Sequence, residues 1–142
     1  MAAAVPRVDE LLTADELQAV VARSDWRAAL VLLANYSLIA GAFALAAAWP
    51  NPLTILVSIL LLAGRQLGLE VLTHDCSHSV LFRYKRVNEL IGNWLCGALT
   101  NTNLYRYRDY HLDHHRYAGT QKDPDLYLAQ MYPVPADSMR RK

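Results

Sequence analysis

The feature that most constrains the fold is a long run without a charged residue, covering residues 28–64. Trp49-Pro50-Asn51-Pro52 interrupts this run, combining turn-forming residues with a tryptophan of the kind found at membrane interfaces. Residues 28–48 and 53–72 each provide roughly the 20 apolar residues that a helix needs to cross hydrocarbon. The sequence therefore predicts an all-α, integral membrane helical hairpin of two transmembrane helices over residues 28–72.

The composition agrees with a single membrane-associated domain. The chain has 142 residues, of which 54% are hydrophobic and only 19% are charged, below the roughly 25% that is usual in soluble domains. A net charge of +1 gives no indication of a nucleic-acid partner. Cys76 and Cys96 lack the framework of a secreted disulfide protein, so we expect reduced thiols on the cytosolic side.

Residues 1–26 form a polar leader ahead of the hairpin. Thr13-Ala14-Asp15-Glu16 has the pattern of a capping box, and apolar residues follow it at helical spacing. This pattern predicts a short amphipathic helix near the membrane surface. The leader lacks the basic start and the small-residue cleavage site of a secretory signal peptide.

Basic residues predict the orientation of the hairpin. Arg23 and Arg27 precede the first span, Arg83 and Lys85 follow the second, and the turn between the spans has no basic residue. By the positive-inside rule, both termini are expected in the cytoplasm, with the protein in a bacterial inner membrane or the endoplasmic reticulum. At 1.5 Å per residue, a helix starting at residue 53 reaches His74 after about 32 Å, just outside the hydrocarbon.

All five histidines lie in two short boxes. His74 and His78 are spaced i, i+4 in H-D-C-S-H, and His111, His114 and His115 are spaced i, i+3, i+4 in H-L-D-H-H. On an α-helix each set falls on one face. Because imidazole is the commonest side-chain ligand for metals such as iron, zinc, copper and nickel, the boxes predict a metal site.

Acidic residues near the boxes have several possible roles. Glu70 lies one turn before His74, where it could ligate the metal or orient His74, or could instead neutralise Arg65 within the second span. Asp75 and Asp113 lie off the ligand face, and an orienting or capping role suits them better than ligation.

Residues between the two boxes predict an interfacial element. Residues 87–99 alternate polar and apolar side chains at helical period, with their apolar side expected in the lipid. Asn101-Thr102-Asn103 predicts a break, and Tyr105-Arg106-Tyr107-Arg108 then leads into the second box. That aromatic and basic run could contact an anionic head group, but it is more typical of simple interface anchoring.

The combination of motifs closely resembles the membrane-bound fatty acid desaturases. The resemblance rests on H-D-C-S-H at the end of a membrane hairpin, H-L-D-H-H followed by K-D-P-D-L, and the linker N-E-L-I-G-N-W-L-C-G. It covers roughly residues 28–127 and makes residues 27–142 a partial desaturase domain. Carotenoid hydroxylases and ketolases and alkane hydroxylases share the outline, whereas the D-P-D tail and the linker favour the desaturases.

The resemblance implies a non-haem di-iron centre that uses dioxygen to remove two hydrogens from an acyl chain. It implies partners as well: the lipid bilayer, an acyl lipid, acyl-CoA or acyl-carrier substrate, and a ferredoxin or haem cytochrome as electron donor. Asp123 and Asp125 match the family's acidic tail, where a turn around Pro124 is at least as well supported as a chemical role. The implied iron ligands are His74, His78, His111, His114 and His115.

The sequence departs from the family pattern after the second box. Desaturases of this type carry a second hairpin and a third histidine box, and no histidine follows His115 here. The resemblance therefore predicts an N-terminal fragment whose di-iron centre is completed by a missing third box. A related hydroxylase or ketolase and a non-catalytic, two-span metal-binding membrane protein remain alternatives.

Overall fold

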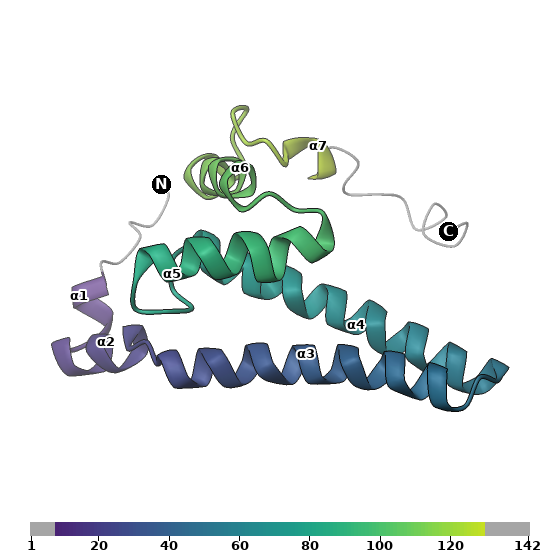
Figure 1. Ribbon diagram of the computed structural model, residues 1–142. Helices are drawn as coiled ribbons and strands as arrows, with labels where there is room; N and C mark the ends of the chain where they lie inside the picture. Colours follow the sequence, from purple (N-terminus) through teal and green to yellow (C-terminus); the bar gives the residue numbers. More distant parts are fainter. Residues whose placement is uncertain (1–7, 130–142) are drawn as a thin grey trace.

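Two long antiparallel helices form the base of the structure, a computed structural model that describes residues 8–129 (Figure 1). They are α3 (Asp25–Ala48) and α4 (Pro52–Ser77). Both are long and apolar enough to cross a membrane, by length and composition. All regular elements within residues 8–129 are helical. The all-α class and the long apolar hairpin are therefore confirmed.

The turn of the hairpin is fixed by the capping of α4. The Asn51 side chain accepts hydrogen bonds from the backbone N–H groups of Leu53 and Thr54, at 3.0 and 3.2 Å. Pro52 follows at the first helical position, where its missing N–H costs nothing. The polar turn residues that interrupt the uncharged run thus end one helix and start the next.

The second long helix continues beyond the predicted span and carries the first histidine box. α4 ends at Ser77, so His74 lies in its last turn and His78 is its C-cap. Ser79 then adopts a left-handed conformation with φ of 58°, and the chain turns back toward α3. There Arg83 N donates to Asp25 Oδ1 at 2.8 Å, which joins this loop to the start of α3.

The leader forms two short helices, α1 (Val8–Leu11) and α2 (Ala14–Val21). The capping box predicted at Thr13 is confirmed, because Thr13 N donates to Glu16 Oε2 at 2.9 Å and Glu16 N donates to Thr13 Oγ1 at 3.4 Å. No residue of α2 is buried, so this helix adds nothing to the core.

The segment between the boxes is a continuous helical stretch whose winding changes twice. It consists of α5 (Lys85–Leu90), the π-helix η1 (Ile91–Cys96) and the 3₁₀ helix η2 (Gly97–Thr100). Gly92 and Cys96 are buried where this stretch packs against α4, whereas Leu90, Trp94 and Leu99 are exposed, so the apolar side expected in lipid stays a prediction. A Cβ at Gly92 would come within 2.4 Å of the Cβ of Cys76, which is why the two helices can approach so closely there.

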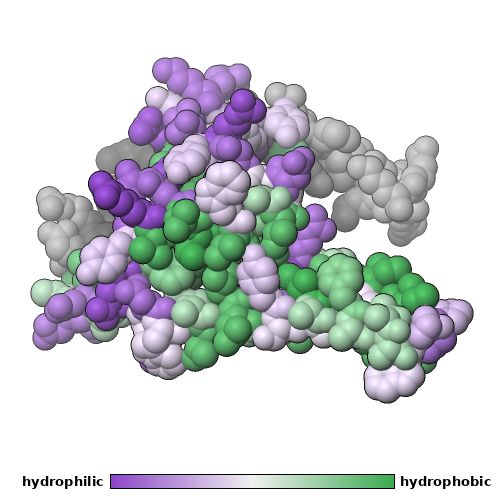
Figure 2. Space-filling view, viewed as in Figure 1, coloured by the Kyte–Doolittle hydropathy of each residue, from purple (hydrophilic) through white to green (hydrophobic). Residues whose placement is uncertain are grey.

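The core is small and lies where this stretch meets the hairpin. Leu69 and Leu72 of α4 pack with Cys96, and partly buried apolar side chains of α3 surround them. Most other apolar residues of the two long helices are exposed. Figure 2 shows hydrophobic residues along the hairpin and hydrophilic residues gathered over the region of α6. This distribution suits a hairpin in lipid with a polar layer beside it.

The second box lies on α6 (Leu104–Tyr117), and the short helix α7 (Leu126–Ala129) follows. The predicted break before α6 is confirmed, because Asn101 has a positive φ of 61° and Asn103 caps the helix. The Asn103 side chain accepts from Tyr105 N and Arg106 N, both at 3.1 Å. Fully buried Leu104 anchors this end of α6.

Candidate metal centre

Four histidines from two helices converge on one point. One ligand atom from each of them lies within 4.8 Å of all the others. His111 Nε2 lies 2.9 Å from His78 Nε2 and 2.9 Å from His115 Nε2. The four residues are His74, His78, His111 and His115.

Their spacing suits a shared cation better than a hydrogen-bond network. A ring nitrogen carries either one hydrogen or one lone pair, so His111 Nε2 cannot bond well to two neighbours at 2.9 Å. Nitrogens bound to one ion at about 2.1 Å and at right angles would lie about 3 Å apart. The donor set and its spacing therefore fit a transition metal.

Electrostatics keep two of these rings, His111 and His78, in the neutral form that ligates a metal. Burial, followed by the neighbouring His74 and His115, lowers the pKa of His111 to about 4. Burial and the same neighbours also lower the pKa of His78. Both imidazoles are therefore neutral at physiological pH, with a lone pair available to a metal.

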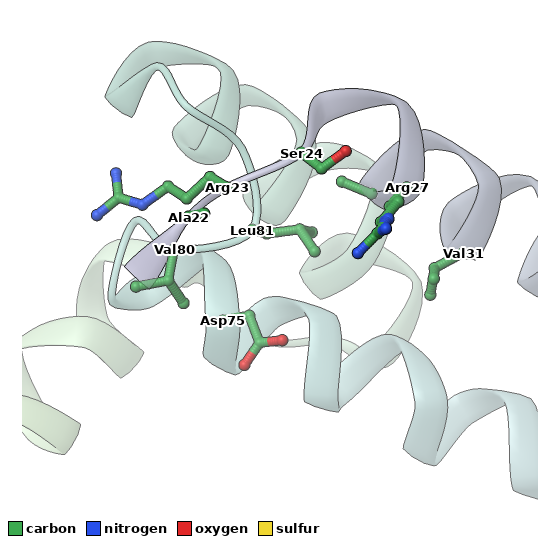
Figure 3. A pocket seen from close by; sticks show the side chains of 9 residues that line it. Ala22, Arg23, Ser24, Arg27, Val31, Asp75, Val80 and Leu81 are labelled. Atoms are coloured by element: carbon green, nitrogen blue, oxygen red, sulfur yellow. The ribbon is translucent and has the colours of Figure 1, made fainter. Parts of the chain in front are cut away.

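Asp75 contacts the ring of His74, as an orienting residue would. Its Oδ1 lies 3.1 Å from His74 Nδ1, which leaves His74 Nε2 as the second ring nitrogen for a metal. Asp75 also lines a pocket of about 260 Å³ to which Arg27 at the start of α3 contributes (Figure 3). The first box is thus open to the surface on the side of Asp75.

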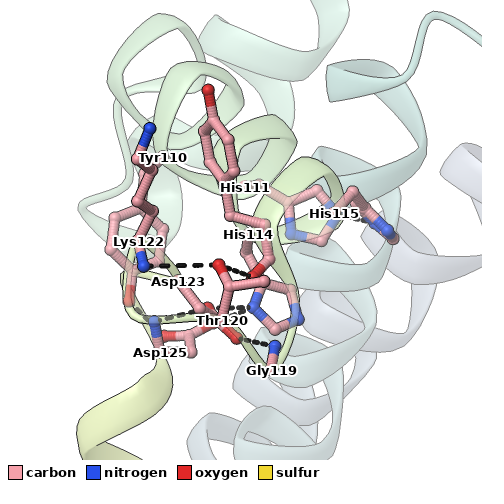
Figure 4. Close-up of polar contacts among 10 residues, drawn as sticks. Tyr110, His111, His114, His115, Gly119, Thr120, Lys122, Asp123 and Asp125 are labelled. Carbon is pink, nitrogen blue, oxygen red and sulfur yellow. Dashed lines mark hydrogen bonds and ion pairs between the residues drawn. The ribbon is translucent and has the colours of Figure 1, made fainter.

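His114 is separated from the other four histidines. Its Nδ1 lies 2.8 Å from Asp123 Oδ1 and 3.3 Å from Asp125 Oδ2, and these three residues form a second group of possible ligands (Figure 4). Consecutive residues of an α-helix point about 100° apart. His115 directs its Nε2 to His111, whereas His114 contacts Asp123 and Asp125, so the five ligands that the resemblance implies fall into two groups.

Asp123 contacts both the backbone of the turn and the ring of His114, which supports the structural role considered for it. Its Oδ2 accepts from Gly119 N at 2.8 Å, and its Oδ1 accepts from Asp125 N at 2.9 Å. The hydrogen bond to Asp123 raises the pKa of His114. The Gly119 N–H and then His114 lower the pKa of Asp123.

Glu70 and Arg65 do not pair with each other in the described part of the chain. Glu70 Oε1 accepts from Thr102 Oγ1 at 2.7 Å, and Arg65 Nη1 donates to Asn35 Oδ1 at 3.2 Å. The charge-neutralising pair considered for these residues is therefore wrong. Glu70 instead joins α4 to the residues just before α6.

Asp113 lies on the outer side of α6. Its carboxylate is 3.4 Å from Arg116 Nη1, and both side chains are mostly exposed. It has no hydrogen bond or ion pair with a histidine in residues 8–129. The orienting role expected for Asp113 is thus not supported by its contacts.

Two residues of the aromatic and basic run are turned toward the site, which the interpretation as an interface anchor did not predict. The ring of Tyr107 stacks on His111, with centroids 5.2 Å apart and planes 9° apart. The side chain of Arg108 is only 15% exposed and bonds to the end of α4. Tyr107 and Arg108 precede His111 by four and three residues, so all three lie on one face of α6. This helical spacing could have indicated from the sequence that Tyr107 and Arg108 face the site.

The comparison with known families is consistent with this geometry. The family model described as fatty acid desaturase matches residues 47–142. This range runs from the turn of the hairpin through both histidine boxes and the acidic tail. No curated protein and no solved structure matches the chain.

Proposed function

Since this chain belongs to the fatty acid desaturase family, we propose that it acts in the dioxygen-dependent introduction of a double bond into an acyl chain. The observation that carries the proposal is the convergence of four imidazoles from two separate helices. An unactivated C–H bond is beyond the reach of acid and base side chains, so a redox-active metal has to supply the oxidant. In the balanced reaction, the two hydrogens of the acyl chain, two electrons and two protons convert dioxygen to two waters.

The described residues fit iron ligation in the following way. His74, His78, His111 and His115 would hold one iron through ring nitrogens that lie close together, and burial lowers the pKa of two of these rings, His111 and His78. His114 would offer its Nε2 to a second iron, because Asp123 occupies its Nδ1. Bound iron would supply the oxidising power for C–H cleavage, and the protein orients His74 through Asp75 and His114 through Asp123.

The location that we propose for this chemistry is the cytosolic surface of a membrane, with both termini in the cytoplasm. The support is the flanking basic residues and the two helices that are long enough to span. An acyl lipid, acyl-CoA or acyl-carrier substrate reaches the site from the bilayer, and a ferredoxin or haem cytochrome delivers electrons. An apolar groove of about 440 Å³ between α3 and η1, lined in part by Leu32 and Leu95, offers surface for an acyl chain.

Cysteine labelling in intact cells tests this topology. Trp49→Cys should react with a membrane-impermeant thiol reagent from outside, because Trp49 is exposed in the turn. Tyr84→Cys, equally exposed beside the first box, should react only after permeabilisation. The native Cys96 cannot serve as a reporter, since it is fully buried. Labelling of residue 84 from outside would reverse the proposed orientation.

The proposed reaction is tested by expressing the protein in membranes with a competent electron donor and measuring iron content and fatty acids together. New double bonds that disappear in His74→Ala and persist in Asp113→Asn support desaturation. Hydroxy or keto products would assign the site to the related hydroxylase or ketolase chemistry. Bound metal without any new fatty acid product, with or without a second polypeptide that carries a third histidine box, would favour a non-catalytic metal-binding protein.

A further inference from the structure

Arg108 makes an unusual set of contacts for a residue in a basic surface run. Its Nε donates to Ser77 O at 2.8 Å and its Nη2 donates to Cys76 O at 3.3 Å. Its Nη1 forms an ion pair with Glu89 Oε1 at 3.0 Å. One guanidinium on α6 therefore connects the end of α4 with α5.

The carbonyls that Arg108 contacts lie inside the first histidine box. The last four carbonyls of a helix lack partners within the helix, and the helix C-terminus favours a positive charge. Cys76 and Ser77 stand between His74 and His78, so a donor held on their carbonyls also fixes the backbone that carries both rings.

The position of Arg108 on α6 connects these carbonyls to the second box. His111 follows three residues later and His115 seven residues later, which places all three on one helical face. The fork of the guanidinium thus sets how far α6 stands from the end of α4 and how it is rotated. The nitrogen of His111 meets that of His78 at 2.9 Å in this arrangement.

We propose that Arg108, held by Glu89, is a positioning residue that brings the second histidine box onto the first. This inference rests on the proposed metal-binding function and adds the residue that assembles the site. Glu89 is partly buried and accepts a hydrogen bond from Arg108. Its carboxylate thereby neutralises the guanidinium next to the packed helices. Lysine cannot replace arginine fully, because a single ammonium lacks the planar fork that reaches two carbonyls and a carboxylate together.

The first measurement is cobalt(II) titration of the purified protein in nanodiscs, followed through the visible absorption of the ligated ion. We expect Arg108→Ala to weaken cobalt binding by on the order of 10–100-fold, as the loss of an outer support of metal ligands does. Arg108→Lys should lie between the wild type and Arg108→Ala. Arg106→Ala is the matched control, because Arg106 is exposed two residues earlier on the same helix.

The second measurement does not depend on metal. Spin labels on Val71→Cys of α4 and Asp113→Cys of α6, both exposed, report the distance between the two helices. The native cysteines are fully buried, so the introduced thiols label selectively. Arg108→Ala should shift or broaden the distance distribution in the metal-free protein, whereas Arg106→Ala should leave it unchanged.

The two measurements separate the outcomes. If the wild type binds no cobalt but the distribution of spin-label distances broadens in Arg108→Ala, the positioning role holds and the proposed function fails. If Arg108→Ala does not fold, Arg108→Lys provides both readouts. Wild-type cobalt affinity together with a wild-type distance distribution in the variant would overturn the proposal.

Discussion

The imidazole of His114 is held by Asp123, with 2.8 Å between Nδ1 and a carboxylate oxygen. The neighbouring His115 instead directs its Nε2 to His111 at 2.9 Å. Two adjacent histidines therefore have separate partners and separate electrostatic surroundings.

Replacing Asp123 by asparagine should release His114 from this arrangement. The hydrogen bond to Asp123 is the first cause of the raised pKa of His114, so Asp123→Asn should lower that pKa toward its ordinary value. Histidine NMR of the metal-free protein measures the change. Asp113→Asn is the control, because Asp113 pairs with Arg116 on the outer side of the same helix.

The sign of the pH effect follows from the two shifts. The raised pKa of His114 gives stability that is present at low pH and is lost as pH rises through the folded-state pKa. The lowered pKa of Asp123 gives stability that is lost as pH falls through its own folded-state value. The pair thus stabilises the fold between these two pKa values, and an unchanged His114 titration in Asp123→Asn would contradict this account.

His111 should titrate far below an ordinary histidine in the metal-free protein, at about 4. As pH falls from about 6.5 toward this value, His111 becomes protonated in the unfolded chain but stays neutral in the folded chain. The fold therefore loses stability across that range. His74→Ala should raise the pKa of His111, because His74 is, after burial, the largest cause of the lowered pKa. Titration of His111 near 6.5 in the wild type would show that the four rings do not converge.

Glu70 and Thr102 should act as a coupled pair. A double-mutant cycle with Glu70→Ala and Thr102→Val should give a coupling of about 0.5–3 kcal/mol in the free energy of unfolding, as contacting residues do. The cycle of Glu70→Ala with Arg65→Gln is the control and should be additive, because Arg65 bonds Asn35 instead. If Glu70 instead coupled to Arg65, and the effects of Glu70→Ala and Thr102→Val were additive, Arg65 and not Thr102 would be the partner of Glu70.

Gly92→Ala should destabilise the packing of η1 on α4. The new Cβ would lie 2.4 Å from Cys76 Cβ, and overpacking of this kind costs about 1–3 kcal/mol. Denaturant unfolding in detergent measures the loss, and cobalt affinity should fall with it because Cys76 lies within the first box. Gly41→Ala is the matched control, since nothing lies within 4 Å of its added Cβ. Equal stability of the two variants would contradict the close approach.

The sequence by itself determined the hairpin, its turn and the content of the two boxes. These features depend on local properties: uncharged runs long enough to span, the capping box at Thr13, the turn around Asn51, the break that ends at Asn103, and histidines at helical spacing. Each requires information from only a few neighbouring residues, which is why hydropathy and spacing were sufficient.

The tertiary structure alone decided which side chains meet. The rotation of α6 against α4 separates His114 from the other histidines, and this rotation depends on packing between segments distant in sequence. Thr102, the partner of Glu70, and Ser77, whose carbonyl Arg108 contacts, each lie about 30 residues away in the chain, beyond the reach of helical periodicity. Periodicity shows that residues share a face, and only the packed helices show what that face contacts.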